Sequence, residues 1–169
     1  NFPEALGLFP PSLARNRDKL IVVGAHNWNG ALASFSNRGP LVDILAPGCA
    51  IGIRTSETGT RRILSGTSFA APFVSYTAAT LRSLWFSDDP AVLKNRIIGA
   101  GRFDPRLVGV TRFGVRLDAP RAIRYREDSY TPKEHNSEPV FGQVDPNQNF
   151  VCQLNGGTKS SLAQGIIKI

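Results

Sequence analysis

A single serine stands where the sequence pattern changes from strand to helix. The segment Leu64–Pro72 reads LSGTSFAAP, and an alanine-rich stretch follows its serine. Gly66 has no side chain, so another part of the chain can approach it closely. Ser68 would then lie at a helix N-terminus, where free N–H groups and the helix dipole favour developing negative charge. This suits the nucleophile of an acyl transfer, although a simple helix-capping serine has the same local pattern.

A serine hydroxyl needs a general base and an orienting carboxylate before it becomes a useful nucleophile. The chain contains two histidines. His26 follows a short apolar run, and His135 lies in a polar, proline-containing stretch. Neither position marks a catalytic base, so we interpret both as surface histidines.

The elements that would position Ser68 alternate in the first half of the chain. Short apolar runs separated by turn residues predict strands, and from Thr67 a step of three and four residues predicts a helix facing a core. A second helix is expected from Pro90 to Ile98, with Asp89 as N-cap and Gly99 as its stop, and a third should start after Asp118. Strands followed by helices indicate an α/β fold with a mostly parallel sheet. The expected strands are Leu20–Val23, Ala31–Phe35, Val42–Leu45, Ala50–Ile53 and Arg62–Leu64.

Several segments around the serine resemble the subtilase family of serine proteases. Ser65–Pro72 is similar to the family's nucleophile motif, Gly-Thr-Ser-x-Ala-x-Pro. The family's other motifs have counterparts in the same order, and they are Ile21–Ala25 (IVVGA), Ala33–Pro40 (ASFSNRGP), Val42–Gly48 (VDILAPG) and Phe113–Ala119 (FGVRLDA). The resemblance covers about residues 1–125. Two departures stand out: Phe73 replaces a common histidine that is not the base, and Val115-Arg116 lacks a second glycine.

The resemblance implies an incomplete doubly wound, three-layer α/β domain with Ser68 as nucleophile. It also implies that Gly66 and Thr67 contact substrate and that Asn1 is a candidate oxyanion donor. The catalytic aspartate and histidine precede the serine in this family, so we expect both N-terminal to Asn1. The 169 residues alone should therefore be inactive, with the missing N-terminal part of the domain as a partner. Asp43 is interpreted as a residue of the fold rather than of the triad.

The sequence after residue 126 differs in composition from the part before it. Residues 1–126 form the expected C-terminal part of the catalytic domain, and residues 127–139 read as a linker. Residues 140–169 are interpreted as an extension, with the start of a second, β-rich module as one possibility. The role of this segment is left open.

The composition of the chain limits the classes of partner that we expect it to bind. The net charge is +7, with an arginine-rich region between residues 102 and 126. No nucleic-acid motif accompanies the charge, so a solvated basic surface is preferred over a nucleic-acid site. No stretch reaches the roughly 18–20 apolar residues of a membrane span. The expected partner is a protein or peptide substrate, and most members of the resembled family are secreted.

Metal and thiol chemistry receive little support from the sequence. Subtilases often bind structural calcium, but no acidic loop here has a convincing ligand spacing, so we predict no cofactor and no metal site. Cys49 and Cys152 fit neither a metal-site spacing nor a disulfide framework. They could pair in an oxidising compartment or remain as two buried thiols.

Two other functions compete with a peptidase. An esterase of the α/β-hydrolase fold would use Ser68 with Asp104 or Asp118 and His135, because that fold orders its triad Ser, Asp, His. A pseudoprotease would keep the fold for binding alone. For a peptidase the cleavage specificity stays open, because much of the wall of the substrate groove would come from the part of the domain expected N-terminal to Asn1.

Overall fold

The computed structural model describes residues 17–54, 59–124 and 134. A four-stranded sheet lies at its centre, in the order β1-β2-β6-β5. Strand β1 (Val23–His26) runs parallel to β2 (Ile44–Pro47), and β2 runs parallel to β6 (Val115–Arg116), whereas β5 (Arg102–Phe103) joins β6 antiparallel. The predicted α/β class with a mostly parallel central sheet is confirmed.

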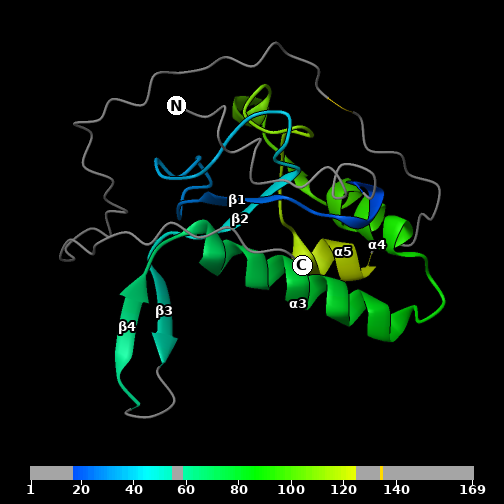
Figure 1. Ribbon diagram of the computed structural model, residues 1–169, viewed down its shortest axis with the longest axis horizontal. Helices are drawn as coiled ribbons and strands as arrows, with labels where there is room; N and C mark the ends of the chain where they lie inside the picture. Colours follow the sequence, from blue (N-terminus) through cyan, green and yellow to red (C-terminus); the bar gives the residue numbers. More distant parts are fainter. Residues whose placement is uncertain (1–16, 55–58, 125–133, 135–169) are drawn as a thin grey trace.

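A separate antiparallel hairpin leads to the serine. It consists of β3 (Ile51–Arg54) and β4 (Arg61–Leu64), paired so that Ile51 faces Leu64. Figure 1 shows this hairpin projecting away from the central sheet and joining α3 at its base. The sequence correctly predicts both strands but not their separation from the main sheet, because local apolar runs carry no information about pairing partners.

Helix α3 (Thr67–Leu84) carries Ser68 as its second residue. Its inner stripe packs on β1 and β2, as the three-and-four spacing predicts. Pro72 is the sixth residue of α3 rather than a first-turn residue. Since proline has no N–H, the Ser68 carbonyl lacks its regular i+4 helical donor. The buried residues of this stripe are Ala70, Ala71, Val74, Thr77 and Leu81.

Two shorter helices complete the core. Helix α4 (Pro90–Gly99) begins at Asp89, whose carboxylate accepts the Ala91 N–H at 2.8 Å, as predicted. Helix α5 (Ala119–Arg124) begins after Asp118, again as predicted. Gly99 does not stop α4 but is its last residue, with Ala100 as C-cap. Both helices contact α3, so the three helices enclose one apolar cluster with the sheet.

Two details of the strand predictions are wrong. The first strand begins at Val23 instead of Leu20, and the expected strand Ala31–Phe35 is a turn region with one isolated bridge between His26 and Leu32. The cause is Asn27, whose side-chain oxygen accepts the Ala31 N–H at 3.0 Å and so reverses the chain. Such an asparagine turn competes with a strand for the same backbone groups.

The ion pair between Asp104 and Arg106 fixes the short turn η2 (Pro105–Leu107) against the sheet. The Asp104 carboxylate is nearly buried, and Arg116 of β6 approaches it at 3.4 Å. The hydrogen bond from the Arg106 guanidinium, with the nearby charge of Arg116, lowers the pKa of Asp104 to about 2. A carboxylate with a depressed pKa stabilises the fold above its unfolded pKa and loses that contribution as the pH falls.

We expect Asp104→Asn to lower the free energy of unfolding near pH 7 by at most about 2 kcal/mol. The difference between variant and wild type should shrink as the pH falls from about 4 to about 2, because the Asp104 carboxyl of the unfolded wild type is protonated in this range before that of the folded protein. Denaturant unfolding at pH 7 and pH 2.5 measures both values. Asp18→Asn, at an exposed carboxylate, is the control and should change neither. A pH-independent loss in Asp104→Asn would contradict this origin.

Candidate active site

The turn before α3 is held between the main sheet and the hairpin. Gly66, its N-cap, is fully extended, with φ 158° and ψ 158°. The Gly66 N–H donates to the Gly48 carbonyl oxygen at 2.8 Å, and the Gly66 carbonyl oxygen accepts the Phe69 N–H at 3.0 Å. Gly48 follows directly after β2. The carboxyl end of β2 and the start of α3 therefore meet at this turn.

Gly48 packs so closely against this turn that no larger side chain fits at its position. A Cβ at Gly48 would lie 2.6 Å from the Ala25 Cβ and 2.8 Å from the Gly66 carbonyl oxygen. Both contacts are shorter than any packed structure allows, and one of them involves backbone that cannot rotate away. Sequence reasoning assigned Gly48 to a matched segment but gave it no role at this turn, because the contact is long-range.

Gly48→Ala should displace the turn that carries Ser68 and destabilise the fold by about 1–3 kcal/mol, the usual cost of overpacking. Gly52→Ala is the matched control, because a Cβ at Gly52 would meet nothing within 4 Å. The free energy of unfolding of the two variants, measured in urea, should differ by more than 1 kcal/mol. Equal stability of the two would show that the close approach at Gly48 does not constrain the turn.

A second hydrogen bond closes the base of the hairpin. The Oγ atom of Ser65, a buried residue, accepts the Ala50 N–H at 2.9 Å. Ser65 therefore holds the beginning of β3 and the end of β4 together, three residues before Ser68. The sequence contains Ser65 in the family motif, but the motif alone does not distinguish this structural serine from the nucleophile.

The Ser68 side chain is half-buried rather than enclosed in apolar packing. Among the described residues, neither its hydroxyl nor its backbone N–H has a hydrogen-bond partner. The free N–H lies in the first turn of an 18-residue helix, where the helix dipole favours negative charge. The Ser68 hydroxyl and backbone N–H are thus without partners in this part of the chain, and the role of Ser68 as nucleophile stays a prediction.

His26, the histidine within the described residues, makes its hydrogen bond away from Ser68. Its Nδ1 atom lies 2.7 Å from the Asn27 carbonyl oxygen, so the neutral ring carries its proton there. No hydrogen bond joins His26 to Ser68 in this part of the chain. Burial lowers the pKa of His26, and the charge of Arg116 adds to this. His26 is thus a half-buried residue at the end of β1 whose ring has a backbone partner.

The other predicted site residues are placed only in part. Thr67, the first residue of α3, is half-buried beside Gly66, and its substrate contact stays a prediction. Phe73 lies on the exposed side of α3. Asn1 and His135 lie outside the described residues. The predicted linker 127–139, apart from residue 134, and the predicted extension 140–169 also lie outside them.

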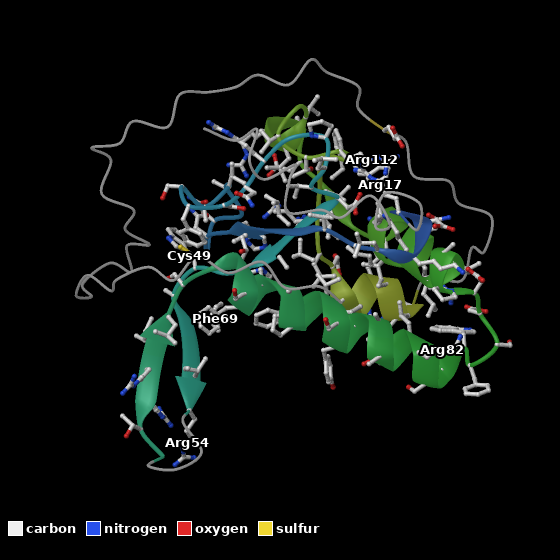
Figure 2. The ribbon with its side chains drawn as sticks, viewed as in Figure 1. Arg17, Cys49, Arg54, Phe69, Arg82 and Arg112 are labelled. Atoms are coloured by element: carbon white, nitrogen blue, oxygen red, sulfur yellow. The ribbon has the colours of Figure 1, made fainter. Side chains whose placement is uncertain are left out.

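Cys49 resolves one alternative that the sequence left open. It is disulfide-bonded, and the sequence contains one other cysteine, Cys152, which lies outside the described residues. Figure 2 shows Cys49 at the base of the hairpin, where β2 passes into β3. The buried-thiol alternative is therefore wrong for Cys49.

The described residues contain no cluster of three or more histidine, cysteine or acidic side chains able to hold a metal ion. Within the same ranges, no helix combines the length and the hydropathy that crossing a bilayer requires.

Among the described residues, Ser68 has no hydrogen-bond partner at the N-terminus of α3, and a strand and an extended glycine lead to it, an arrangement compatible with a serine hydrolase. The model of the subtilase family matches residues 5–114, which is more than half of the chain. The chain belongs to the subtilase family. This match removes support for the α/β-hydrolase alternative, in which the Ala33–Pro40 and Val42–Gly48 segments have no role.

The relatives found by sequence are longer proteins. The chain is 42% identical over 82 residues to a putative subtilisin-like proteinase 1 of Encephalitozoon cuniculi, covering 48% of this chain and 17% of that protein. It is 44% identical over 80 residues to the subtilase-type proteinase psp3 of Schizosaccharomyces pombe, covering 46% and 16%. The match thus spans about a sixth of the length of these relatives.

Solved structures agree with the fold. The prenylagaramide maturation protease PagA aligns with a TM-score of 0.52 at 32% identity, covering 62% of this chain and 41% of that one. MycP1 with its N-terminal propeptide removed aligns with a TM-score of 0.55 at 27% identity, covering 67% and 38%. In both cases this chain corresponds to less than half of the solved protein.

Proposed function

We propose that Ser68 is the nucleophile of a serine endopeptidase site that hydrolyses peptide bonds through an acyl-enzyme. The observation that carries this proposal is the half-exposed Ser68 hydroxyl at the N-terminus of α3, without a partner in the part of the chain that the structure describes, in a chain of the subtilase family. In the first step, Oγ attacks the peptide carbonyl carbon, its proton passes to a base, and the amine leaves with that proton. Water then hydrolyses the ester and returns the proton to Ser68.

The base and its orienting carboxylate would come from polypeptide outside these 169 residues. The reason is that His26 is hydrogen-bonded to Asn27 and has no bond to Ser68 among the described residues. Asn1 stays a candidate for the second oxyanion donor, beside the backbone N–H of Ser68. Gly66 and Thr67 would contact the substrate chain from the start of α3. Alone, the chain would then be inactive.

The exposed face of α3 supports the proposal that further polypeptide completes the catalytic site. Phe73 is 41% exposed and Tyr76 is 75% exposed, although both belong to a long central helix. Figure 2 shows Phe69 on the same side of α3, facing away from β1 and β2. A row of large apolar side chains of this kind marks a surface that another part of a protein covers. Its position beside Ser68 is where the polypeptide that carries the base would have to pack.

The remaining functional assignments follow from the same proposal. The substrate is a protein or peptide, and no nucleic-acid or membrane partner is proposed. Disulfide bonds persist in oxidising compartments, so the disulfide-bonded Cys49 supports a secreted or extracytoplasmic location. No cofactor is proposed.

Hydrolysis of a chromogenic peptide ester tests the proposal with two proteins: the 169 residues alone, and a version extended N-terminally with the upstream sequence of its own gene. The expected result is turnover by the extended protein and none above buffer by the short chain. Turnover by the short chain would contradict the proposal. Absence of turnover in a folded extended protein that still binds peptides would favour the pseudoprotease alternative.

A further inference from the structure

The β3–β4 hairpin has features that the nucleophile turn does not require. We call the paired residues 51–54 and 61–64 the arm. It forms a two-stranded sheet of its own, so each strand has an outer edge that no described strand pairs with. Figure 1 shows the arm projecting from the body on the opposite side from α4. Unpaired edges present free N–H and C=O groups, to which an extended peptide can add as a further strand.

The arm carries three arginines, and two of them lie directly opposite each other on the paired strands. Arg54 and Arg61 are directly opposite each other in the register, on one face, and Arg62 faces Ile53 on the other. All three arginines are exposed, and no carboxylate of the described ranges forms an ion pair with them. Within the described ranges, Arg54 Nε donates to the Gly59 carbonyl oxygen at 3.3 Å. Like charges at directly opposite positions destabilise a hairpin. An anion bound between Arg54 and Arg61 would therefore reduce their electrostatic repulsion.

The same face of the arm also has room for a side chain. Gly52 faces Ile63 across the hairpin, and a Cβ at Gly52 would meet nothing within 4 Å. Ile63 is 51% exposed, which leaves half of a large apolar side chain open next to the two arginines. The face therefore offers an apolar contact beside a pair of cations.

We propose that the arm binds an acidic peptide segment in extended conformation, with Arg54 and Arg61 pairing with its carboxylates. The free edges favour a peptide, because backbone N–H and C=O groups pair with peptide backbone rather than with a nucleic acid. The paired residues contain no aromatic side chain on which bases could stack. Arg54 and Arg61 form the strand pair furthest from Ser65, so the bound segment would lie toward the outer end of the arm, away from the turn that carries Ser68. Binding does not depend on Ser68 being catalytic.

Fluorescence anisotropy with a labelled ten-residue peptide of alternating glutamate and threonine tests this proposal on the full 169-residue chain. Its affinity should fall about tenfold in the double variant Arg54→Gln/Arg61→Gln, since each lost exposed ion pair contributes a part of that factor. It should also fall when glutamine replaces the glutamates, when prolines replace the threonines, and when salt is raised.

The control variant is Arg102→Gln/Arg124→Gln, which removes two exposed arginines outside the arm and gives the same net charge, from +7 to +5. It should change the affinity less than about twofold, since its charges are remote from the bound segment. Circular dichroism checks that all variants are folded. Reversal of charge in Arg54→Glu/Arg61→Glu should shift the preference to a lysine–threonine peptide.

Three results would overturn the proposal. The first is an equal loss of affinity in the arm and control variants, which would mean that only net charge matters. The second is unchanged binding of the proline peptide, which would exclude strand addition. The third is a single-stranded oligonucleotide of matched charge that binds the arm as tightly as the glutamate peptide.

Discussion

Replacement of Ser68 by alanine should abolish peptide hydrolysis by the N-terminally extended protein. The expected loss in kcat is on the order of 10⁶, the magnitude established for loss of the serine within this family. The physical reason is that no covalent intermediate can form, while the free N–H groups at the start of α3 remain in place. Substrate binding should therefore survive, and KM should change little.

Ser83→Ala is the matched control for this variant, because Ser83 is an exposed serine near the far end of the same helix. It should leave kcat and KM unchanged. Steady-state kinetics with one peptide substrate measure both variants. Retention of more than about one hundredth of the wild-type kcat in Ser68→Ala would mean that another group carries the reaction.

The second large effect concerns a buried ion pair under the sheet. Lys94 of α4 donates to the fully buried Asp43 carboxylate at 3.1 Å and also to the carbonyl oxygens of Arg17 and Leu20. Asp43 also accepts the Val22 N–H at 2.9 Å. Burial lowers the pKa of Lys94, and the negative charge of Asp43 opposes this. The ammonium group thus compensates a carboxylate and two carbonyl oxygens at once.

Lys94→Met should lower the free energy of unfolding by about 3–5 kcal/mol, since it leaves a buried charge without its closest partner. Arg17 and Arg112 lie at 3.9 and 3.8 Å from the other Asp43 oxygen and cannot replace the hydrogen bonds of Lys94. Urea unfolding measures the loss, with Lys19→Met, at an exposed lysine, as the control. The double variant Asp43→Asn/Lys94→Met should lose less than the sum of the two single variants. A loss below 1 kcal/mol in Lys94→Met would show that Asp43 is compensated by other groups.

The elements that the sequence predicted well are those with local causes. Helix α3 follows from its apolar spacing, α4 from the Asp89-Pro90 start, and α5 from Asp118. The Ser68 turn was predictable because glycine, serine and an alanine-rich helix are contiguous in the chain. The structure places Ser68 half-exposed as the second residue of α3, and its catalytic role stays a prediction.

What the sequence did not predict depends on long-range contacts. Strands β5 and β6 have two residues each and exist because they pair with the sheet, so no periodicity announces them. A lysine in a helix is usually solvent-facing, and only the packing of α4 shows that Lys94 contacts Asp43. The steric limit at Gly48 likewise appears only when β2 meets the turn before Ser68.

Labelling with a fluorophosphonate tests most directly whether Ser68 is a nucleophile activated from outside the chain. This reagent phosphonylates a serine only when a base removes its proton. Intact-mass and peptide mass spectrometry should find one adduct, on Ser68, in the extended protein, and none in the 169-residue chain at the same concentration. Equal labelling of Ser68 in the short chain, or labelling of a different serine in the extended protein, would contradict the assignment.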